Sequence, residues 1–203
     1  MTMSFKVHYQ HSVLLIDILI ELEVANLGRT TTPSPTVQWM PGRWRPPNDG
    51  ACVKVNMDGA ISRRGTTGAA AAVCRDGLGN YLGASTIVLD GLVDAPSLES
   101  HTCNEGLVLA RDLNISHAIV ASDYMQVVTD IKRGSSSSYA FLLREINERM
   151  IDFVKISFCF ESRESNFEAH ALAKAASSLP SGRHMWLGIL PDIICIPLVL
   201  NFE

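Results

Sequence analysis

Two acidic residues of this sequence end patterns that are typical of strands. Asp58 closes an alternating stretch, lies on its polar side in step with Asn56, and is followed by Gly59. Asp123 directly follows the apolar run 118–122, at the entry of a predicted helix. Singly, these residues have ordinary roles, because Asp-Gly pairs form turns and an aspartate at a helix start is a common N-cap. Their positions also fit a ligand site, because open α/β sheets bind ligands beyond the ends of their strands.

A third acidic residue, Glu99, falls in the first turn of a predicted helix, behind Asp94 as a cap and Pro96 as an early helical residue. A glutamate there complements the helix dipole. Its face continues through Cys103 and Gly106, and this small, apolar face must dock on the sheet. A carboxylate on a docking face is costly unless a positive charge meets it. Dipole complementation therefore does not explain where Glu99 points.

The three carboxylates are expected to converge. The strands that end at Asp58 and Asp123 are predicted neighbours, and Glu99 begins the helix that leads into the second of them. Three carboxylates brought together in this way repel each other unless a divalent cation lies between them. The sequence therefore predicts a divalent metal site.

The elements that would position this site begin at residue 51. Apolar periodicity predicts three consecutive strands, followed by helices that alternate with strands. The predicted strands are 53–58, 67–74, 81–89, 117–122 and 155–160, and the predicted helices are 96–113, 123–132, 140–153 and 166–177. This order predicts an α/β fold with a mixed sheet and helices on its faces.

The whole chain divides into four predicted parts. An amphipathic helix at 12–27 offers a face for a protein partner, and a Pro- and Thr-rich linker follows it. Trp39 and Trp44 in that linker are expected to pin it to the domain surface. The parts are an N-terminal helical segment, the linker, the main domain and an apolar C-terminal extension, at residues 1–28, 29–50, 51–180 and 181–203.

Composition excludes several classes of protein. The 203 residues hold 17 Lys and Arg against 21 Asp and Glu, so a basic coat for nucleic acid is absent and any such binding must be local. No apolar stretch is long enough to predict a membrane span. Asp17 interrupts the N-terminal apolar stretch, so we expect an intracellular protein, in the nucleus or cytoplasm, rather than a secreted one. The cysteines are odd in number and scattered along the chain, which indicates reduced thiols. They are Cys52, Cys74, Cys103, Cys159 and Cys195.

Short motifs in a fixed order give the chain a resemblance to a known family. The motifs are Trp44-Arg45-Pro46-Pro47, Val55-Asn56-Met57-Asp58-Gly59-Ala60, Arg75-Asp76 with Gly79, Glu99 with Cys103, Glu105-Gly106-Leu107, Leu109-Ala110, Ser122-Asp123, Arg163-Glu164-Ser165-Asn166, Ala169-His170, Leu172-Ala173-Lys174, and Trp186 with Pro191. In this order and spacing, residues 51 to about 200 resemble the ribonuclease H-like domain of plant reverse-transcriptase-like and retroelement-derived proteins.

The resemblance implies a fold and an activity. The implied fold is a five-stranded mixed sheet in the order 3-2-1-4-5, flanked by helices. The implied activity is endonucleolytic hydrolysis of the RNA strand of RNA–DNA hybrids with Mg²⁺ or Mn²⁺, using two ions. The catalytic and metal-binding residues that it implies are Asp58, Glu99, Asp123 and His170.

The chain departs from that family at the fourth of these positions. His170 stands where ribonucleases H of established activity have aspartate, and imidazole is a poorer Mg²⁺ ligand than carboxylate. The alternative interpretation is a catalytically weak or inactive module, derived from a retroelement, that binds hybrid or double-stranded RNA. Both interpretations need side chains that contact nucleic acid, and the candidates are Asn56, Arg63, Arg64, Arg163, Asn166 and Lys174.

Overall fold

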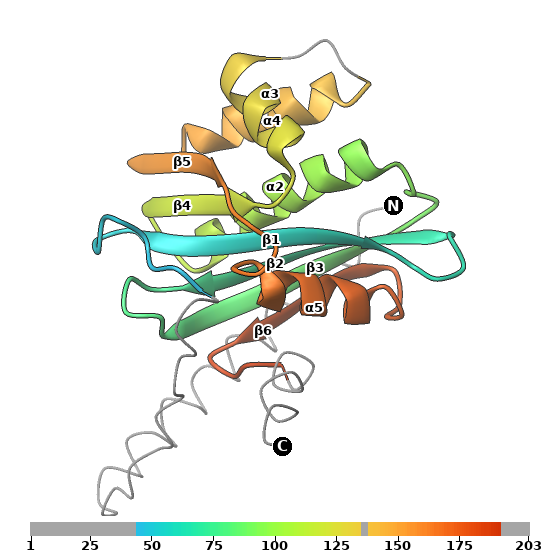
Figure 1. Ribbon diagram of the computed structural model, residues 1–203, viewed down its shortest axis with the longest axis horizontal. Helices are drawn as coiled ribbons and strands as arrows, with labels where there is room; N and C mark the ends of the chain where they lie inside the picture. The colour runs from blue at the N-terminus through green and yellow to red at the C-terminus, as the bar shows by residue number, and fades with distance from the viewer. Residues whose placement is uncertain (1–43, 135–137, 192–203) are drawn as a thin grey trace, which may run out of the picture. The chain divides into compact units, whose positions relative to one another are not determined.

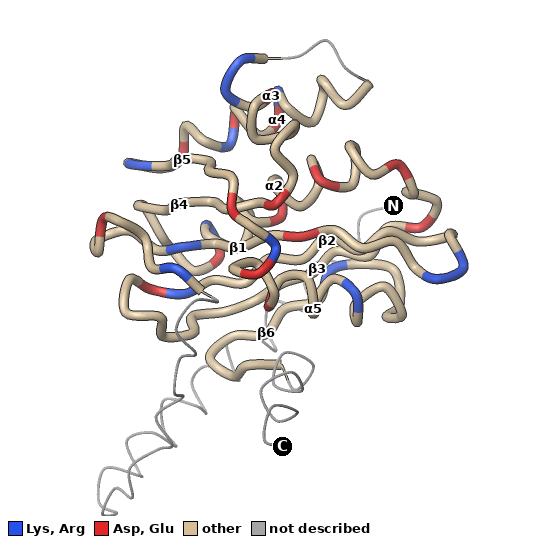
Figure 2. The backbone as a smooth tube through the Cα atoms, in the orientation of Figure 1, with Lys and Arg blue, Asp and Glu red and all other residues tan. Residues whose placement is uncertain are grey.

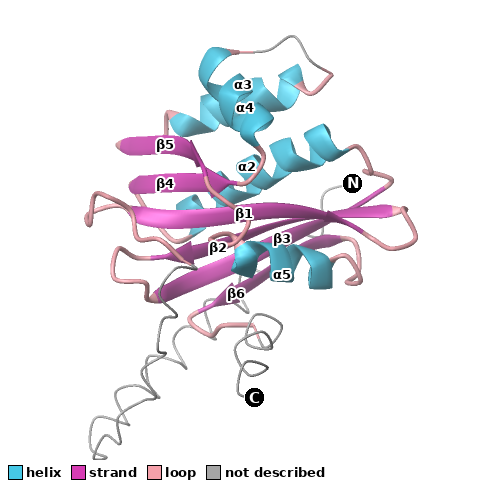
Figure 3. Ribbon diagram, viewed as in Figure 1, coloured by secondary structure: helices cyan, strands magenta, loops and turns pink. Residues whose placement is uncertain are grey.

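The computed structural model describes residues 44–134 and 138–191, and within them a sheet carries helices on both faces (Figures 1 and 3). The elements are β1 (Val53–Ile61), β2 (Thr67–Arg75), β3 (Tyr81–Asp90), α2 (Ala95–Asp112), β4 (His117–Ser122), α3 (Met125–Arg133), α4 (Ala140–Met150), β5 (Lys155–Phe160), α5 (Phe167–Ala176) and β6 (Gly182–Leu187). Every strand and helix predicted from residue 51 onward is present, with small shifts at the ends.

The sheet has six strands in the order β5-β4-β1-β2-β3-β6. β1 pairs antiparallel with β2 and parallel with β4, so the initial meander and the alternating half of the chain meet at β1. The strands from β3 to β5 follow the predicted order 3-2-1-4-5, but the predicted total of five strands is wrong. The additional strand β6 comes from residues expected to form an extension, and it pairs antiparallel with β3.

Long-range contacts hold β6 at the sheet edge. The Arg183 guanidinium lies 2.7 Å from Glu105 Oε1 and 2.7 Å from Asp112 Oδ2, both on α2. The Tyr81 hydroxyl donates to the Trp186 carbonyl across the β3–β6 pair (2.8 Å). These partners are far from β6 in sequence, which is why no local pattern predicted the strand.

The two faces of β1 meet different layers. Val55 and Met57 pack in the main core with α2, whereas Asn56 and Asp58 face α5 on the other side. A Cβ at Gly106 would lie 2.4 Å from Met57 Sδ, so α2 packs this closely on β1 because residue 106 has no side chain. This contact fixes the position of α2, which carries Glu99.

Trp44, at the end of the predicted linker, contacts the α5 face of the sheet. Its Nε1–H donates to Asn56 Oδ1 (3.2 Å), and its ring centroid lies 5.5 Å from Lys54 Nζ. These contacts confirm that Trp44 pins the linker to the domain. The predicted helix 12–27 and Trp39 lie outside the described residues.

Two further predictions can be compared with the described part of the chain. There, the cysteines are free thiols, as expected, and Cys195 lies beyond it; the described ones are Cys52, Cys74, Cys103 and Cys159. None of the helices within the described ranges is long and apolar enough to cross a membrane.

Candidate metal centre and active site

The parallel pairing of β1 with β4 brings two of the predicted carboxylates together. Met57 lies opposite Ser122, the last residue of β4, so Asp58 within β1 and Asp123 just after β4 come together where this pairing ends. Asp123 does not cap α3, because the N-cap of that helix is Tyr124, whose N–H is bonded to Ser122 Oγ. The Asp123 side chain is therefore available to the site.

Glu99 reaches the same point from α2. Asp94 caps this helix as predicted, with its carboxylate accepting from the Ser97 N–H (3.0 Å). Glu99 then falls on the face that packs on the sheet, where it is buried. A Cβ at Gly59 would lie 3.2 Å from Glu99 Oε1, so the glycine after Asp58 leaves room for the incoming carboxylate.

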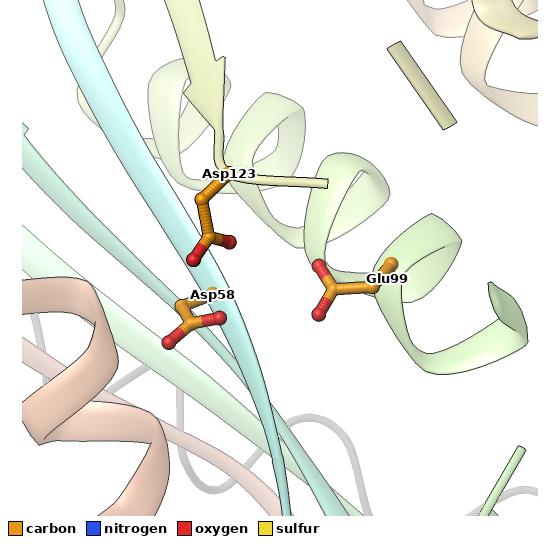
Figure 4. A group of neighbouring side chains, drawn as sticks. All are labelled: Asp58, Glu99 and Asp123. Atoms are coloured by element: carbon orange, nitrogen blue, oxygen red, sulfur yellow. The ribbon is translucent and has the colours of Figure 1, made fainter. Parts of the chain in front are cut away.

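Asp58, Glu99 and Asp123 form what we call the carboxylate cluster (Figure 4). Each offers one oxygen, and these oxygens all lie within 4.8 Å of one another. Burial, and then the charges of Asp58 and Asp123, raise the pKa of Glu99 to about 8. Burial and then Asp123 raise the pKa of Asp58, although His170 and the Gly59 N–H oppose that rise.

The carboxylate cluster fits a hard divalent cation. Glu99 Oε2 is buried and has no hydrogen-bond partner among the described residues. A buried carboxylate oxygen without a donor is costly, and a cation would satisfy it. Mg²⁺ and Mn²⁺ prefer oxygen ligands of this kind, so the residues present match the predicted ions.

His170 lies beside the carboxylate cluster on α5. Its Nδ1 is 2.5 Å from Asp58 Oδ2, and Asp58 Oδ1 accepts from the Gly59 N–H (2.9 Å). Arg163 Nη2 lies 3.1 Å from His170 Nδ1 and 3.4 Å from Nε2. The structure thus brings His170 to the cluster as the hydrogen-bond partner of Asp58, and its role as a metal ligand stays a prediction.

Next to the cluster, the same face of β1 carries a second polar group, which we call the buried network: Lys54, Asn56, Glu161 and Asn166. Lys54 Nζ lies 2.6 Å from Glu161 Oε1, and Asn56 Nδ2 donates to Glu161 Oε2 (2.9 Å). Asn56 Nδ2 also donates to Asn166 Oδ1 (3.0 Å), and Asn166 Nδ2 donates to the Met57 carbonyl (2.6 Å). These bonds tie the loop before α5, and hence the start of α5, to β1.

The predicted nucleic-acid contacts separate into two groups. Asn56 and Asn166 are only 4% and 1% exposed and are used within the buried network, so their side chains do not offer a surface to nucleic acid. Arg63, Arg64 and Lys174 line a hollow of about 670 Å³ between the β1–β2 turn and α5. Basic positions at that turn and along the loop before α5 are visible in Figure 2.

A family model described as reverse transcriptase-like matches residues 56–176, which is more than half of the chain. The chain belongs to the reverse transcriptase-like family. All members of the carboxylate cluster lie inside the matched range, together with Arg163 and His170. No curated protein matches this reverse transcriptase-like chain.

Solved structures establish the fold of this reverse transcriptase-like domain. RNase H1 from the halophilic archaeon Halobacterium salinarum is 19% identical, with a TM-score of 0.56, over 62% of this chain and 96% of that one. The N-terminal RNase H domain of a Mycobacterium tuberculosis protein is 20% identical, with a TM-score of 0.56, over 62% of this chain and 95% of that one. The fold is therefore ribonuclease H-like.

Sequence reasoning missed two features of this reverse transcriptase-like domain that position the site. Glu161 was not singled out as the partner of Lys54, although Lys54, Asn56 and Asp58 share the polar face of one strand. That continuous polar face was the available signal, because a buried face of a strand carries such residues only if partners meet them. The contact of Arg163 with His170 has no such local signal.

Proposed function

We propose that this domain is a metal-dependent endonuclease that hydrolyses the RNA strand of RNA–DNA hybrids. The observation that carries the proposal is the carboxylate cluster, in which a buried oxygen of Glu99 has no partner among the residues that the structure describes. The ribonuclease H-like fold and the family match support it. The solved structures with a similar fold are described as RNase H proteins, and the range matched by the family model contains the cluster.

Asp58, Glu99 and Asp123 would hold Mg²⁺ or Mn²⁺. A bound ion supplies Lewis acidity toward a phosphate oxygen and a water molecule. The chain fixes the ligands in advance: the Gly59 N–H and His170 hold the two oxygens of Asp58, and α2 holds Glu99 close to Gly59 of β1. This preorganisation directs the ion to one place beside Asp58 on β1.

Phosphate groups of the hybrid would meet the exposed basic side chains. Arg163 lies beside the cluster, and Arg63, Arg64 and Lys174 line the hollow along α5. With a net charge of −4 over the whole chain, attraction of the hybrid must be local, and these residues would supply it beside the cluster. Binding is therefore expected to be moderate and to weaken steeply as salt increases.

Cleavage of an end-labelled RNA–DNA hybrid by the full chain, with Mg²⁺ and Mn²⁺ in parallel, tests the proposal. Asp58→Asn should lower the rate by at least about a hundredfold while the circular dichroism spectrum stays native. Asp152→Asn is the matched control, because Asp152 is half exposed and pairs with Arg111 at the surface. Cleavage by Asp58→Asn at the native rate would refute the proposal.

A second candidate function is hybrid binding without cleavage. The observation that favours it is His170 in place of a fourth carboxylate. It predicts no cutting with either metal, together with salt-sensitive hybrid binding that survives Asp58→Asn. Fluorescence anisotropy with a labelled hybrid at low salt distinguishes the two functions, and absence of binding there excludes the second.

A further inference from the structure

His170 is bonded to Asp58 through one ring nitrogen, and Arg163 lies against its ring. Nδ1 lies 2.5 Å from Asp58 Oδ2, and an ionised carboxylate only accepts hydrogen bonds, so Nδ1 carries the proton of that bond. Arg163 Nη2 lies 3.1 Å from Nδ1 and 3.4 Å from Nε2, so it lies against the ring and not in line with the lone pair of one nitrogen. With Asp58 ionised, as a metal ligand must be, Nδ1 is therefore used by the bond to Asp58, and the guanidinium lies against the ring.

Arg163 places a permanent positive charge at this position. The guanidinium stays protonated at all ordinary pH values. It is exposed to solvent, and it is held against His170, which is itself fixed to Asp58. Figure 4 shows Glu99 and Asp123 on one side of Asp58 and α5, the helix that carries His170, on the other.

A second divalent ion would have to lie on that α5 side. Ions of a two-metal site are about 3.5–4 Å apart and share a bridging carboxylate, which here would be Asp58. The Asp58 oxygen on that side already accepts from His170, and the Arg163 guanidinium within hydrogen-bond distance of the ring would repel a dication. The fourth carboxylate that would offset this repulsion is absent, because residue 170 is histidine.

We propose that the site holds one divalent ion, among Asp58, Glu99 and Asp123, and that Arg163 supplies the second positive charge to the phosphate being cleaved. Arg163 is then a catalytic residue, and His170 is a positioning residue that holds the guanidinium beside Asp58. This inference rests on the proposed function and replaces the expectation of two ions.

The reaction balances with these groups. A water oxygen bonds to phosphorus and gives one proton to solvent, while the bond between phosphorus and the leaving sugar oxygen breaks. That oxygen takes one proton from solvent, since a guanidinium does not give one up. Arg163 stabilises the charge that develops on the phosphate oxygens, as arginine does in other phosphoryl transfers.

The first test counts ions. Full-length protein is mixed with an RNA–DNA hybrid whose RNA linkages carry CH₂ in place of the leaving oxygen, and bound Mn²⁺ is measured by electron paramagnetic resonance. The native chain should bind one Mn²⁺ per complex. The double variant Arg163→Ala with His170→Asp, which removes the guanidinium and restores a carboxylate, should bind two. Two ions on the native chain, or one ion on the double variant, would overturn the inference.

The second test separates catalysis from binding with a cleavable hybrid. Arg163→Ala should lower kcat by about a hundredfold or more with little change in KM, and its Mn²⁺ affinity without hybrid should stay native. Arg163→Lys should recover only part of the rate, because it keeps the charge but loses the planar fork. Arg144→Ala is the matched control, since Arg144 is 80% exposed on α4.

The outcomes of the second test separate this inference from the proposed function. A rise in KM with unchanged kcat would make Arg163 a mere phosphate contact and overturn the inference, while the endonuclease would stand. A native chain that binds no Mn²⁺ or cuts no hybrid would refute the proposed function itself, and the inference with it.

Discussion

β1 carries the buried network and the carboxylate cluster side by side, and the polar atoms of the two groups are satisfied in different ways. In the buried network, Lys54 meets Glu161, and every side-chain polar atom of the network has a partner inside the chain. In the carboxylate cluster, Glu99 keeps a buried oxygen without a partner among the described residues, and no described side chain pairs with all three acids: His170 bonds Asp58 alone. The network is therefore complete as it stands, whereas the cluster is complete only with a cation.

The largest expected effect comes from breaking the buried network. Glu161→Ala leaves the Lys54 ammonium buried without its carboxylate, and loss of one partner of a buried pair costs about 3–5 kcal/mol of unfolding free energy. Urea unfolding measures the loss. Glu148→Ala, which removes an exposed carboxylate 3.8 Å from Arg144, should change stability by no more than about 0.5 kcal/mol. Equal losses for the two variants would show that the network is not a stabilising unit.

The next effect should come from supplying the cation that the cluster lacks. Mg²⁺ at about one hundred times its dissociation constant should raise the unfolding free energy by about 2.7 kcal/mol, because it binds only the native state. A chelator should reverse this gain, and Glu99→Gln should abolish it. Glu148→Gln, at the surface of α4, should keep it. A full Mg²⁺ gain in Glu99→Gln would place the ion elsewhere.

Without metal, the cluster should also make stability depend on pH. The pKa of Glu99 is about 8 in the native state against 4.5 ordinarily, so between these values the native state binds more protons than the unfolded chain. Unfolding free energy must then fall as pH rises, by about 1.4 kcal/mol per unit at most. Between pH 6 and 7.5, chelated protein should lose about 2 kcal/mol. Chemical unfolding of Glu99→Gln should show a smaller fall, and identical curves would contradict the assignment.

The sequence predicted much of this fold because local patterns carried it. The alternation of apolar and polar residues predicted β1. The convergence of Asp58, Glu99 and Asp123 followed from a strand order that the family resemblance and the chain connections both implied. β6 was missed because its edge position depends on β3 and on Arg183 contacts with α2, which no local pattern encodes. The residue types near the site were likewise visible in the sequence, whereas the contact of Arg163 with His170 depends on how the loop before α5 folds.

The smallest expected effect tests whether the two groups on β1 act independently. Trp44→Phe keeps an aromatic ring near Lys54 but removes the N–H that donates to Asn56 Oδ1, which should cost about 1 kcal/mol. In chelated protein, its effect and that of Glu99→Gln should add within about 0.5 kcal/mol, because the Trp44 N–H bonds Asn56 whereas Glu99 lies beside Gly59. Asn56 and Asp58 are nevertheless near neighbours on one strand face. A larger coupling in the double-mutant cycle would mean that the backbone of β1 transmits changes in the network to the metal ligands, and the distinction between a complete network and an incomplete cluster would no longer hold.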